Sequence, residues 1–316
     1  MALSESRHAF FKGKIVPLDQ AKVSIRTHAL NYGTGVFEGI RAYWNEADGE
    51  LYVFRMREHY ERLLQNARML MIELPYDAEA LCEITLELLR KDGLRRNTYI
   101  RPLVYKSQEI IGAIRLHELE ADFSIFCVTL DKYIDRPQGC HAGVSSWRRV
   151  DDTSLPPRGK FTGSYVNSAF AKSEAQLNGF DEAIVLNQDG HVAEGSAENL
   201  MMVRGGKLIT SPVYANILEG ITRDTVQTLA REQLGLESVE RPIDRSELYV
   251  AEELFFCGTG VEIVPIAKVD HRPVGNGAVG PVTEKVRQLY HQAVRGQLSA
   301  YPHWLTPVFQ SATQAV

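Results

Sequence analysis

Turn signals between apolar runs are the feature that most constrains how this chain can fold. Aspartate or glycine followed by glycine is typical of the turn in a β-hairpin, because glycine readily adopts the positive φ angles that such turns need. The pairs that stand between apolar runs are Asp48-Gly49, Asp189-Gly190 and Gly205-Gly206. Antiparallel strands are therefore expected in both halves of the chain.

Helical patterns separate the predicted strands. The first part of the chain predicts strands at 37–44, 51–55, 98–105 and 123–130, and helices at 58–72 and 77–92. The remainder predicts strands at 142–150, 182–186, 192–204, 208–210, 254–257 and 263–269, and helices at 164–177, 222–234 and 282–295. The predicted fold class is α+β, with a smaller N-terminal α+β domain at 1–130, an interdomain linker at 131–139 and a larger β-rich mixed domain at 140–316.

Charge and composition narrow the classes of partner. The net charge is -5 and lysine and arginine form no cluster, which argues against a nucleic-acid-binding protein. No apolar run reaches the length of a membrane span, and residues 1–14 lack the apolar core of a signal peptide. The cysteines show no C-x-x-C spacing, and no metal site is expected. These features favour a cytoplasmic protein that acts on small molecules.

One lysine is distinguished by its setting. Lys160 ends the run Pro156-Pro157-Arg158-Gly159-Lys160, just ahead of a predicted helix. A lysine held on a short loop between packed elements can be partly desolvated, which lowers its pKa and lets its amine attack an aldehyde. Most loop lysines are surface charges, so this interpretation depends on what the rest of the chain contains.

Two carboxylates and an amide lie in a run of small and apolar residues. The run is Val192-Ala193-Glu194-Gly195-Ser196-Ala197-Glu198-Asn199-Leu200. Small neighbours let a flat ligand approach the backbone, and a buried carboxylate needs a cationic or hydrogen-donating partner. A protonated pyridine nitrogen would be such a partner for Glu194. Pairing with an arginine and capping of a turn are the alternatives.

Two turns can hold an anion through backbone N–H groups. Gly220 precedes Ile221 and Thr222 at the start of a predicted helix, whose first N–H groups have no acceptor within the helix. Gly258-Thr259-Gly260 follows a predicted strand and offers a second set of donors with a hydroxyl. Either turn alone is a weak signal, and the two together favour a phosphate-bearing ligand.

In their order along the chain, these motifs resemble the branched-chain amino-acid aminotransferases, a family of fold-type-IV pyridoxal-phosphate enzymes. The resemblance covers about nine-tenths of the chain. The matching runs are Ala29 to Arg41, Phe54 to His59, Tyr99 to Pro102, Ser145 to Trp147, Lys160, Glu194 to Asn199, Gly220 to Asp224 and Gly258-Thr259. The family's fold implies two domains with the cofactor at their interface.

The resemblance implies pyridoxal 5'-phosphate as cofactor. Lys160 would hold its aldehyde covalently and serve as the catalytic base and acid that moves a proton between substrate and cofactor. Glu194 would keep the pyridine nitrogen protonated, and Tyr165 would hydrogen-bond the phenolic oxygen. The residues implied for the phosphate are Arg55, Ile221, Thr222 and Thr259.

The resemblance also implies a set of substrate-binding residues: Tyr32, Phe37, Gly39, Tyr99, Arg101, Tyr133, Thr259 and Gly260. Tyr99 and the Thr259 and Gly260 amides would bind the α-carboxylate, and Arg101 would bind the side-chain carboxylate of glutamate. Core packing is the alternative for the aromatic residues. The implied reaction transfers the amino group of leucine, isoleucine or valine to 2-oxoglutarate, giving 2-oxo acids and glutamate, in at least a homodimer.

Some positions depart from the family pattern. Leu130 stands where a tryptophan is common, Gly260-Val261 replaces a pair of small residues, and Arg115 lies in a stretch without the glycine-rich loop of some members. These differences concern the substrate pocket. Transamination of D-amino acids or (R)-amines, aminodeoxychorismate lyase activity, and ligand binding without catalysis on the same scaffold therefore stay open as alternatives.

Overall fold

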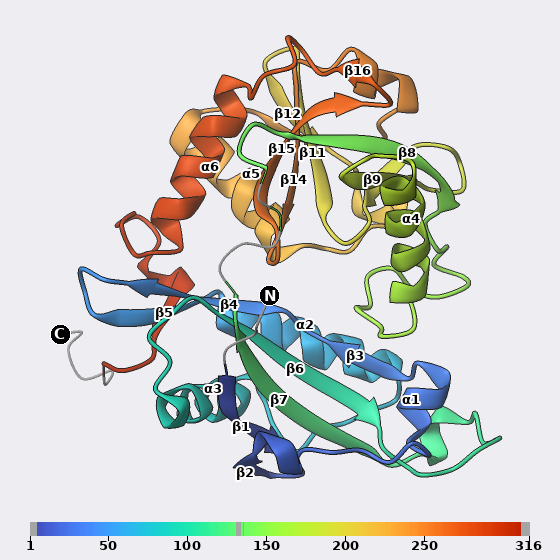
Figure 1. Ribbon diagram of the computed structural model, residues 1–316, viewed down its shortest axis with the longest axis vertical. Helices are drawn as coiled ribbons and strands as arrows, with labels where there is room; N and C mark the ends of the chain where they lie inside the picture. The colour runs from blue at the N-terminus through green and yellow to red at the C-terminus, as the bar shows by residue number, and fades with distance from the viewer. Residues whose placement is uncertain (1–4, 131–133, 135, 311–316) are drawn as a thin grey trace. The chain divides into compact units, whose positions relative to one another are not determined.

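A computed structural model describes residues 5–130, 134 and 136–310 (Figure 1). The chain forms two compact units, one of Met1–Asp131, Gly159–Gly163 and Gln292–Val316, the other of Lys132–Arg158 and Ser164–His291. The predicted domains are continuous stretches, whereas each unit is assembled from separate segments. The division into domains stays a prediction, and part of the predicted linker at 131–139 lies outside the described residues.

The first unit is built on an eight-stranded sheet in the order β17-β5-β4-β6-β7-β1-β2, with β3 paired to β6. Its strands are β1 (Glu5–Phe11), β2 (Lys14–Pro17), β3 (Gly35–Phe37), β4 (Ile40–Asn45), β5 (Glu50–Phe54), β6 (Thr98–Lys106), β7 (Ala121–Thr129) and β17 (Leu305–Pro307). The hairpin predicted at Asp48-Gly49 is confirmed, because Trp44 pairs with Leu51 in antiparallel register. The predicted strand at 37–44 is interrupted after Phe37 and resumes at Ile40.

Helices of the first unit pack on this sheet and on each other. They are α1 (His28–Tyr32), α2 (Met56–Met69) and α3 (Ala78–Asp92), with short 3-10 turns η1 (Leu18–Gln20), η2 (Leu116–Glu118) and η5 (Pro302–Trp304). The Asp77 carboxylate caps α3 by accepting from the Ala80 N–H, and Gly93 ends it with a φ of 61°. α2 contacts both α3 and β3, and α3 contacts β1.

The second unit is built on a nine-stranded mixed sheet in the order β10-β9-β8-β15-β14-β11-β12-β13, with β16 paired to β15. Its strands are β8 (Cys140–Arg148), β9 (Glu182–Leu186), β10 (Val192–Gly195), β11 (Asn199–Arg204), β12 (Lys207–Thr210), β13 (Ser238–Glu240), β14 (Glu253–Gly258), β15 (Glu262–Val269) and β16 (Arg272–Pro273). β8 runs parallel to β9 and β15, and β12 runs parallel to β13. The hairpins predicted at 189–190 and 205–206 are confirmed as β9-β10 and β11-β12.

Three α-helices lie in this part of the chain at positions close to the predicted ones. They are α4 (Tyr165–Leu177), α5 (Ile221–Leu234) and α6 (Pro281–Ala293), with 3-10 turns η3 (Val213–Ala215) and η4 (Arg245–Tyr249). α4 packs on β8 and β9, and α5 packs on β14 and β13. The α+β class is confirmed. Among the described residues, no helix combines the length and apolar character needed to cross a membrane.

One predicted strand of the second unit is wrong as a single element. The run at 192–204 forms two strands, because the chain turns between Gly195 and Glu198, where the Gly195 N–H donates to the Glu198 carbonyl at 2.7 Å. β10 then pairs with β9, and β11 pairs with β14. Glu194 and Asn199 are thereby placed on either side of one turn.

Candidate active site

Lys160 lies on a loop that is held against strand β3 within the first unit. The Phe37 N–H donates to the Lys160 carbonyl at 3.1 Å, and the Thr162 N–H donates to the Gly35 carbonyl at 2.8 Å. These bonds fix the backbone on both sides of the lysine. Its side-chain Nζ lies 5.3 Å from the centre of the Phe37 ring. The structure therefore brings the predicted catalytic lysine to one of the predicted substrate residues.

A buried cluster of charges supports the residue next to Phe37. The Glu38 carboxylate accepts from His59 Nδ1 at 2.8 Å and from two guanidinium nitrogens of Arg62 at 2.7 and 2.8 Å. Although burial opposes ionisation, Arg62 and His59 hold the pKa of Glu38 well below its ordinary value. The cluster joins the β3-β4 connection to α2 and was not predicted from the sequence.

Four of the predicted substrate residues form one group in the first unit. Arg101 donates to the Tyr99 hydroxyl at 2.8 Å, and its guanidinium carbon lies 4.2 Å from the centre of the Phe37 ring and 5.2 Å from that of Tyr99. Gly39 leaves room for Tyr99, because a Cβ at position 39 would lie 2.2 Å from the tyrosine oxygen. The group combines aromatic faces with one guanidinium, and can contact both apolar and anionic side chains.

The other residues implied by the resemblance in this unit have separate contacts. Tyr32 is 40% exposed at the end of α1, and its hydroxyl accepts from the Gly112 N–H at 2.9 Å. Arg55 has a φ of 48° and pairs with Glu58 at 2.8 Å, with its guanidinium over the Trp304 ring. Tyr133 lies outside the described residues.

Glu194 is the centre of a buried group in the second unit. One of its oxygens accepts from Arg149 Nε at 2.9 Å, and the side chains of Arg149 and Glu194 are 9% and 4% exposed. The other oxygen accepts from Asn199 Nδ2 at 3.0 Å and from the Leu218 N–H at 3.1 Å. The pairing with an arginine that the sequence left open is thus present. These donors come from the residue after β8, from β11 and from the segment before α5, and they hold the carboxylate in one position.

Arg149 is a site residue that the sequence analysis missed. It follows β8 directly, and its backbone N–H donates to the Leu186 carbonyl of β9 at 2.9 Å. The available signal was a basic residue near the end of a predicted strand. Its pairing with Glu194 could not be read from the sequence, because it depends on how the strands are arranged.

The two predicted anion turns both lie in the second unit. α5 begins at Ile221, its N-cap Gly220 provides no side-chain cap, and Thr222 is buried in the first turn. A Cβ at Gly220 would lie 2.0 Å from Asn199 Oδ1, so the amide that binds Glu194 also packs against the start of this helix. Gly258 ends β14, and Thr259 and Gly260 form the turn that follows it. An uncapped helix start and a turn with a hydroxyl suit a phosphate group chemically.

Tyr165 is the first residue of α4, five positions after Lys160.

The structure also shows the surroundings of the residues that depart from the family pattern. The Leu130 carbonyl accepts from Arg41 at 2.7 Å, and Val261 is buried. The Arg115 side chain is 72% exposed and pairs with Glu118 at 2.8 Å. Arg115 thus forms an ion pair at the surface.

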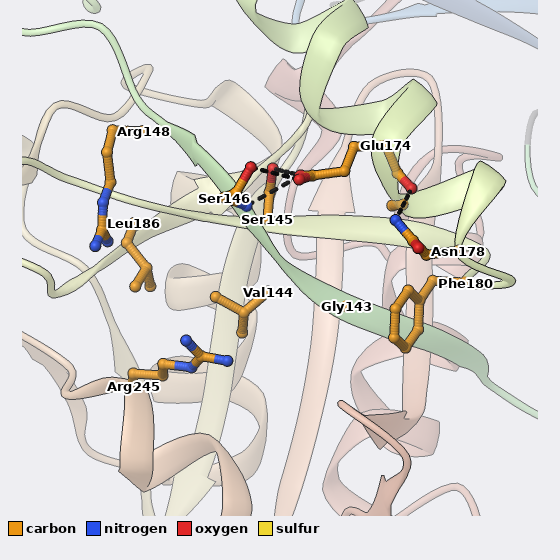
Figure 2. Close-up of a pocket in the computed structure, with 11 residues that line it drawn as sticks. Gly143, Val144, Ser145, Ser146, Arg148, Glu174, Asn178, Phe180, Leu186 and Arg245 are labelled. Atoms are coloured by element: carbon orange, nitrogen blue, oxygen red, sulfur yellow. Dashed lines mark hydrogen bonds between the residues drawn. The ribbon is translucent and has the colours of Figure 1, made fainter.

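A cavity of about 290 Å³ lies in the second unit beside β8, β9 and α4. Figure 2 shows Glu174 of α4 turned toward Ser145 and Ser146 of β8, with Phe180 and Arg245 on the cavity wall. Hydrogen bonds from the two serines hold the pKa of Glu174 below its ordinary value, against the effect of burial. None of the predicted site residues lines this cavity, so it is distinct from the groups around Lys160 and Glu194.

Comparisons with known proteins agree with the motifs. Residues 35–269 match the family model described as amino-transferase class IV. A probable branched-chain-amino-acid aminotransferase of Aquifex aeolicus is 50% identical over 301 residues, which cover 95% of this chain and 96% of that protein.

Solved structures with a similar fold are also branched-chain aminotransferases. A branched-chain aminotransferase from Thermoproteus uzoniensis with norvaline aligns with a TM-score of 0.91 at 44% identity, covering 96% of this chain and 99% of that one. The branched-chain amino acid aminotransferase from Thermobaculum terrenum in its PLP form (holo form) aligns with a TM-score of 0.91 at 40% identity, with the same coverage of 96% and 99%.

Proposed function

The chain belongs to the class IV aminotransferases, and on this premise we propose that its cofactor is pyridoxal 5'-phosphate and its amino donors are branched-chain L-amino acids. The amino group passes to 2-oxoglutarate, and the products are a branched-chain 2-oxo acid and glutamate. The names of the relatives from Aquifex aeolicus, Thermoproteus uzoniensis and Thermobaculum terrenum support this substrate class for this chain.

The residues around Glu194 and α5 fit this cofactor. Arg149, Asn199 and the Leu218 N–H keep the Glu194 carboxylate in one place, suited to hold a proton on a ring nitrogen. The start of α5 at Ile221 and Thr222, the hydroxyl of Thr259 and the guanidinium of Arg55 would bind the phosphate. Tyr165 would donate to the phenolic oxygen. When bound, the cofactor accepts the amino group and draws electrons away from the substrate Cα.

Lys160 would hold the cofactor covalently and then transfer protons as a base and as an acid. The backbone bonds to Phe37 and Gly35 keep its loop in place, so that its amine can take a proton from the substrate Cα and return one later. A single amine serves both as base and as acid, which fits a reaction run in two opposite halves. The order of events is amino acid in, 2-oxo acid out, then the reverse with 2-oxoglutarate, so ping-pong kinetics follow.

The observation that carries the substrate proposal is the position of Arg101 over the Phe37 ring and beside Tyr99. Aromatic faces contact the aliphatic side chain of leucine, isoleucine or valine, and the guanidinium pairs with the side-chain carboxylate of glutamate or 2-oxoglutarate. Tyr99, with the Thr259 and Gly260 amides, would bind the α-carboxylate that both substrates share. The same group thus accepts two chemically different side chains.

A homodimer is part of the proposal. The segment around α1 and the stretch at 108–114 lie side by side, because Thr27 pairs with Glu109 and the His28 N–H donates to the Gln108 carbonyl. Together they expose several large apolar side chains: Ile25, Leu30, Ile111 and Ile114. Several large exposed apolar residues on neighbouring segments are typical of association surfaces. Sedimentation of the purified protein tests this point.

A screen of isolated half-reactions tests the proposed function. Cofactor-loaded enzyme is mixed with one amino donor and no acceptor, and the 2-oxo acid or ketone released in a single turnover is quantified. L-leucine, L-isoleucine, L-valine and L-glutamate should each release product. Faster release from D-leucine or an (R)-amine would overturn the assignment of substrate class, whereas no release from any donor would overturn catalysis itself.

A further inference from the structure

A second buried carboxyl group, that of Glu198, belongs to the same turn as Glu194. Glu198 closes that turn and is 4% exposed, and Glu182 at the start of β9 is 1% exposed. The side chains of these two glutamates contact each other. Lys172 of α4 donates to Glu182 Oε2 at 2.5 Å and to the Asp181 carbonyl at 2.7 Å. Three ionisable side chains therefore form a connected series from α4 through β9 to the turn: Lys172, Glu182 and Glu198.

Among these three side chains, one carboxylate oxygen receives no hydrogen bond from a donor in the described part of the chain. Glu182 Oε1 accepts from the Ala183 N–H at 2.8 Å, and Glu198 Oε2 accepts from the Ala197 N–H at 2.9 Å. Glu198 Oε1 is buried and, among the described residues, has no hydrogen-bond donor. A buried carboxylate oxygen in that state is unfavourable, and a hydrogen bond between two carboxyl groups requires a proton on one of them.

We propose that Glu198 and Glu182 share one proton and that Glu198, as a neutral acid bonded to Glu182, is a positioning residue for Glu194. Glu182 is the ionised member, because it has the ammonium of Lys172 as a partner. Glu198 keeps the proton, because the ammonium of Lys172 donates to Glu182, whereas the Ala197 N–H is the only donor to the Glu198 carboxyl group among the described residues. The part of this inference that concerns Glu194 rests on the proposed function.

The surroundings of Glu198 favour the neutral form. Burial and then the neighbouring Glu182 raise the pKa of Glu198 well above its ordinary value of 4.5, against the opposing effects of Lys172 and the Ala197 N–H. Glu198 also interacts electrostatically with the Cys140 thiol of β8 and the Cys257 thiol of β14. Burial raises the pKa of both thiols, so neither offers a charge to Glu198.

Packing connects this acid to both ligand-binding turns of the second unit. A Cβ at Gly195 would lie 2.9 Å from Glu198 Cγ, and a Cβ at Gly258 would lie 3.3 Å from Glu198 Cβ. Gly195 adjoins Glu194, and Gly258 adjoins Thr259. The Glu198 side chain thus fills the space behind both turns, and its bond to Glu182 ties them to β9. Ionisation of Glu198 would place two like charges in this space and loosen the tie.

Infrared spectroscopy of the holoenzyme tests the shared proton without reference to activity. The parent protein at neutral pH should show the C=O stretching band of a buried neutral carboxylic acid. Glu198→Gln should remove that band, and Glu174→Gln, the matched control with an ionised glutamate on α4, should retain it. Absence of the band in the parent, or its survival in Glu198→Gln, would overturn the shared proton.

The pH dependence of thermal unfolding gives a second test. A group with a raised pKa in the folded state stabilises the fold fully below its ordinary pKa of 4.5, and this stabilisation is lost as the pH rises toward the folded value. Glu198→Gln keeps a neutral donor to Glu182, so its Tm should fall less than that of the parent as the pH is raised. A parallel fall in both proteins would contradict the proposal.

The positioning role has its own measurement. Glu198→Ala should slow the half-reaction with leucine about tenfold, because a misplaced Glu194 acts less well, and Glu198→Gln should recover most of that rate. Parent rates in the alanine variant, or no recovery with glutamine, would overturn the positioning role. If the parent protein itself released no 2-oxo acid, the proposed function would fail, while the infrared result would still decide the shared proton.

Discussion

The group around Arg101 and the group around Glu194 are held in different ways. Arg101 is held by a hydrogen bond to Tyr99 and by contact with aromatic faces, so its charge is directed by weak and adaptable interactions. Glu194 is held by an arginine, an amide and a backbone N–H from three segments, so its position is fixed. A fixed carboxylate suits a partner that is always the same, and an adaptable guanidinium suits partners that alternate.

Removal of the Lys160 amine should have the largest effect. Lys160→Ala should lower the turnover of leucine with 2-oxoglutarate by at least about a thousandfold, because the covalent and proton-transfer roles are lost together. Steady-state release of 2-oxo acid measures this. Lys12→Ala, a surface control, should match the parent. Substantial turnover by Lys160→Ala without an added amine would show that another lysine anchors the cofactor.

The fixed group should tolerate substitution poorly and without regard to substrate. Glu194→Gln should slow the leucine and glutamate half-reactions alike, by about a hundredfold, since a neutral amide cannot hold a ring proton as a carboxylate does. Glu237→Gln, on the surface and paired with Lys207, is the control and should stay within about twofold. Parent rates for Glu194→Gln in both half-reactions would remove Glu194 as the ring partner.

The adaptable group should instead distinguish between substrates. Arg101→Gln should remove the proposed charge-assisted hydrogen bond to the side chain of glutamate, a loss of about 1.5 to 3 kcal/mol, or roughly ten- to a hundredfold in specificity constant. The value for leucine should change by less than about threefold. Measuring the two half-reactions separately distinguishes a selective loss with glutamate from a folding defect, which would slow both half-reactions. Equal losses would contradict the role given to Arg101.

Arg115 offers the smallest effect and a matched arginine control. Its side chain is exposed and paired with Glu118, so Arg115→Gln should change both half-reactions by less than about twofold. A selective loss with glutamate in this variant, seen in the same single-turnover assay, would transfer the proposed recognition role from Arg101 to Arg115.

Local patterns in the sequence predicted the elements that local interactions determine. The α3 helix is capped by Asp77 at its start and by Gly93 at its end, and the hairpins at 189–190 and 205–206 follow from their glycines. The split of the strand predicted at 192–204 was missed, because it follows from the pairing of β10 with β9 and of β11 with β14, and the second pairing joins segments far apart in the chain. Strand β17 was missed as well, since its pairing with β5 joins segments about 250 residues apart in the chain.

The same distinction applies to the candidate site. Phe37, Gly39, Tyr99 and Arg101 could be proposed from motifs, and the structure brings them together in one unit. Arg149 could not, because its pairing with Glu194 is a tertiary contact between residues far apart in sequence. Tyr133 lies outside the described residues, and its role stays a prediction.

Transfer of a labelled amino group tests the central claim most directly. The cofactor-loaded enzyme is incubated with ¹⁵N-leucine and unlabelled 2-oxoglutarate, and the label in glutamate and in free ammonia is measured by mass spectrometry. The proposed function predicts ¹⁵N-glutamate in an amount equal to the 2-oxo acid formed from leucine. Label that stays in leucine, or that is released as ammonia without labelled glutamate, would contradict it.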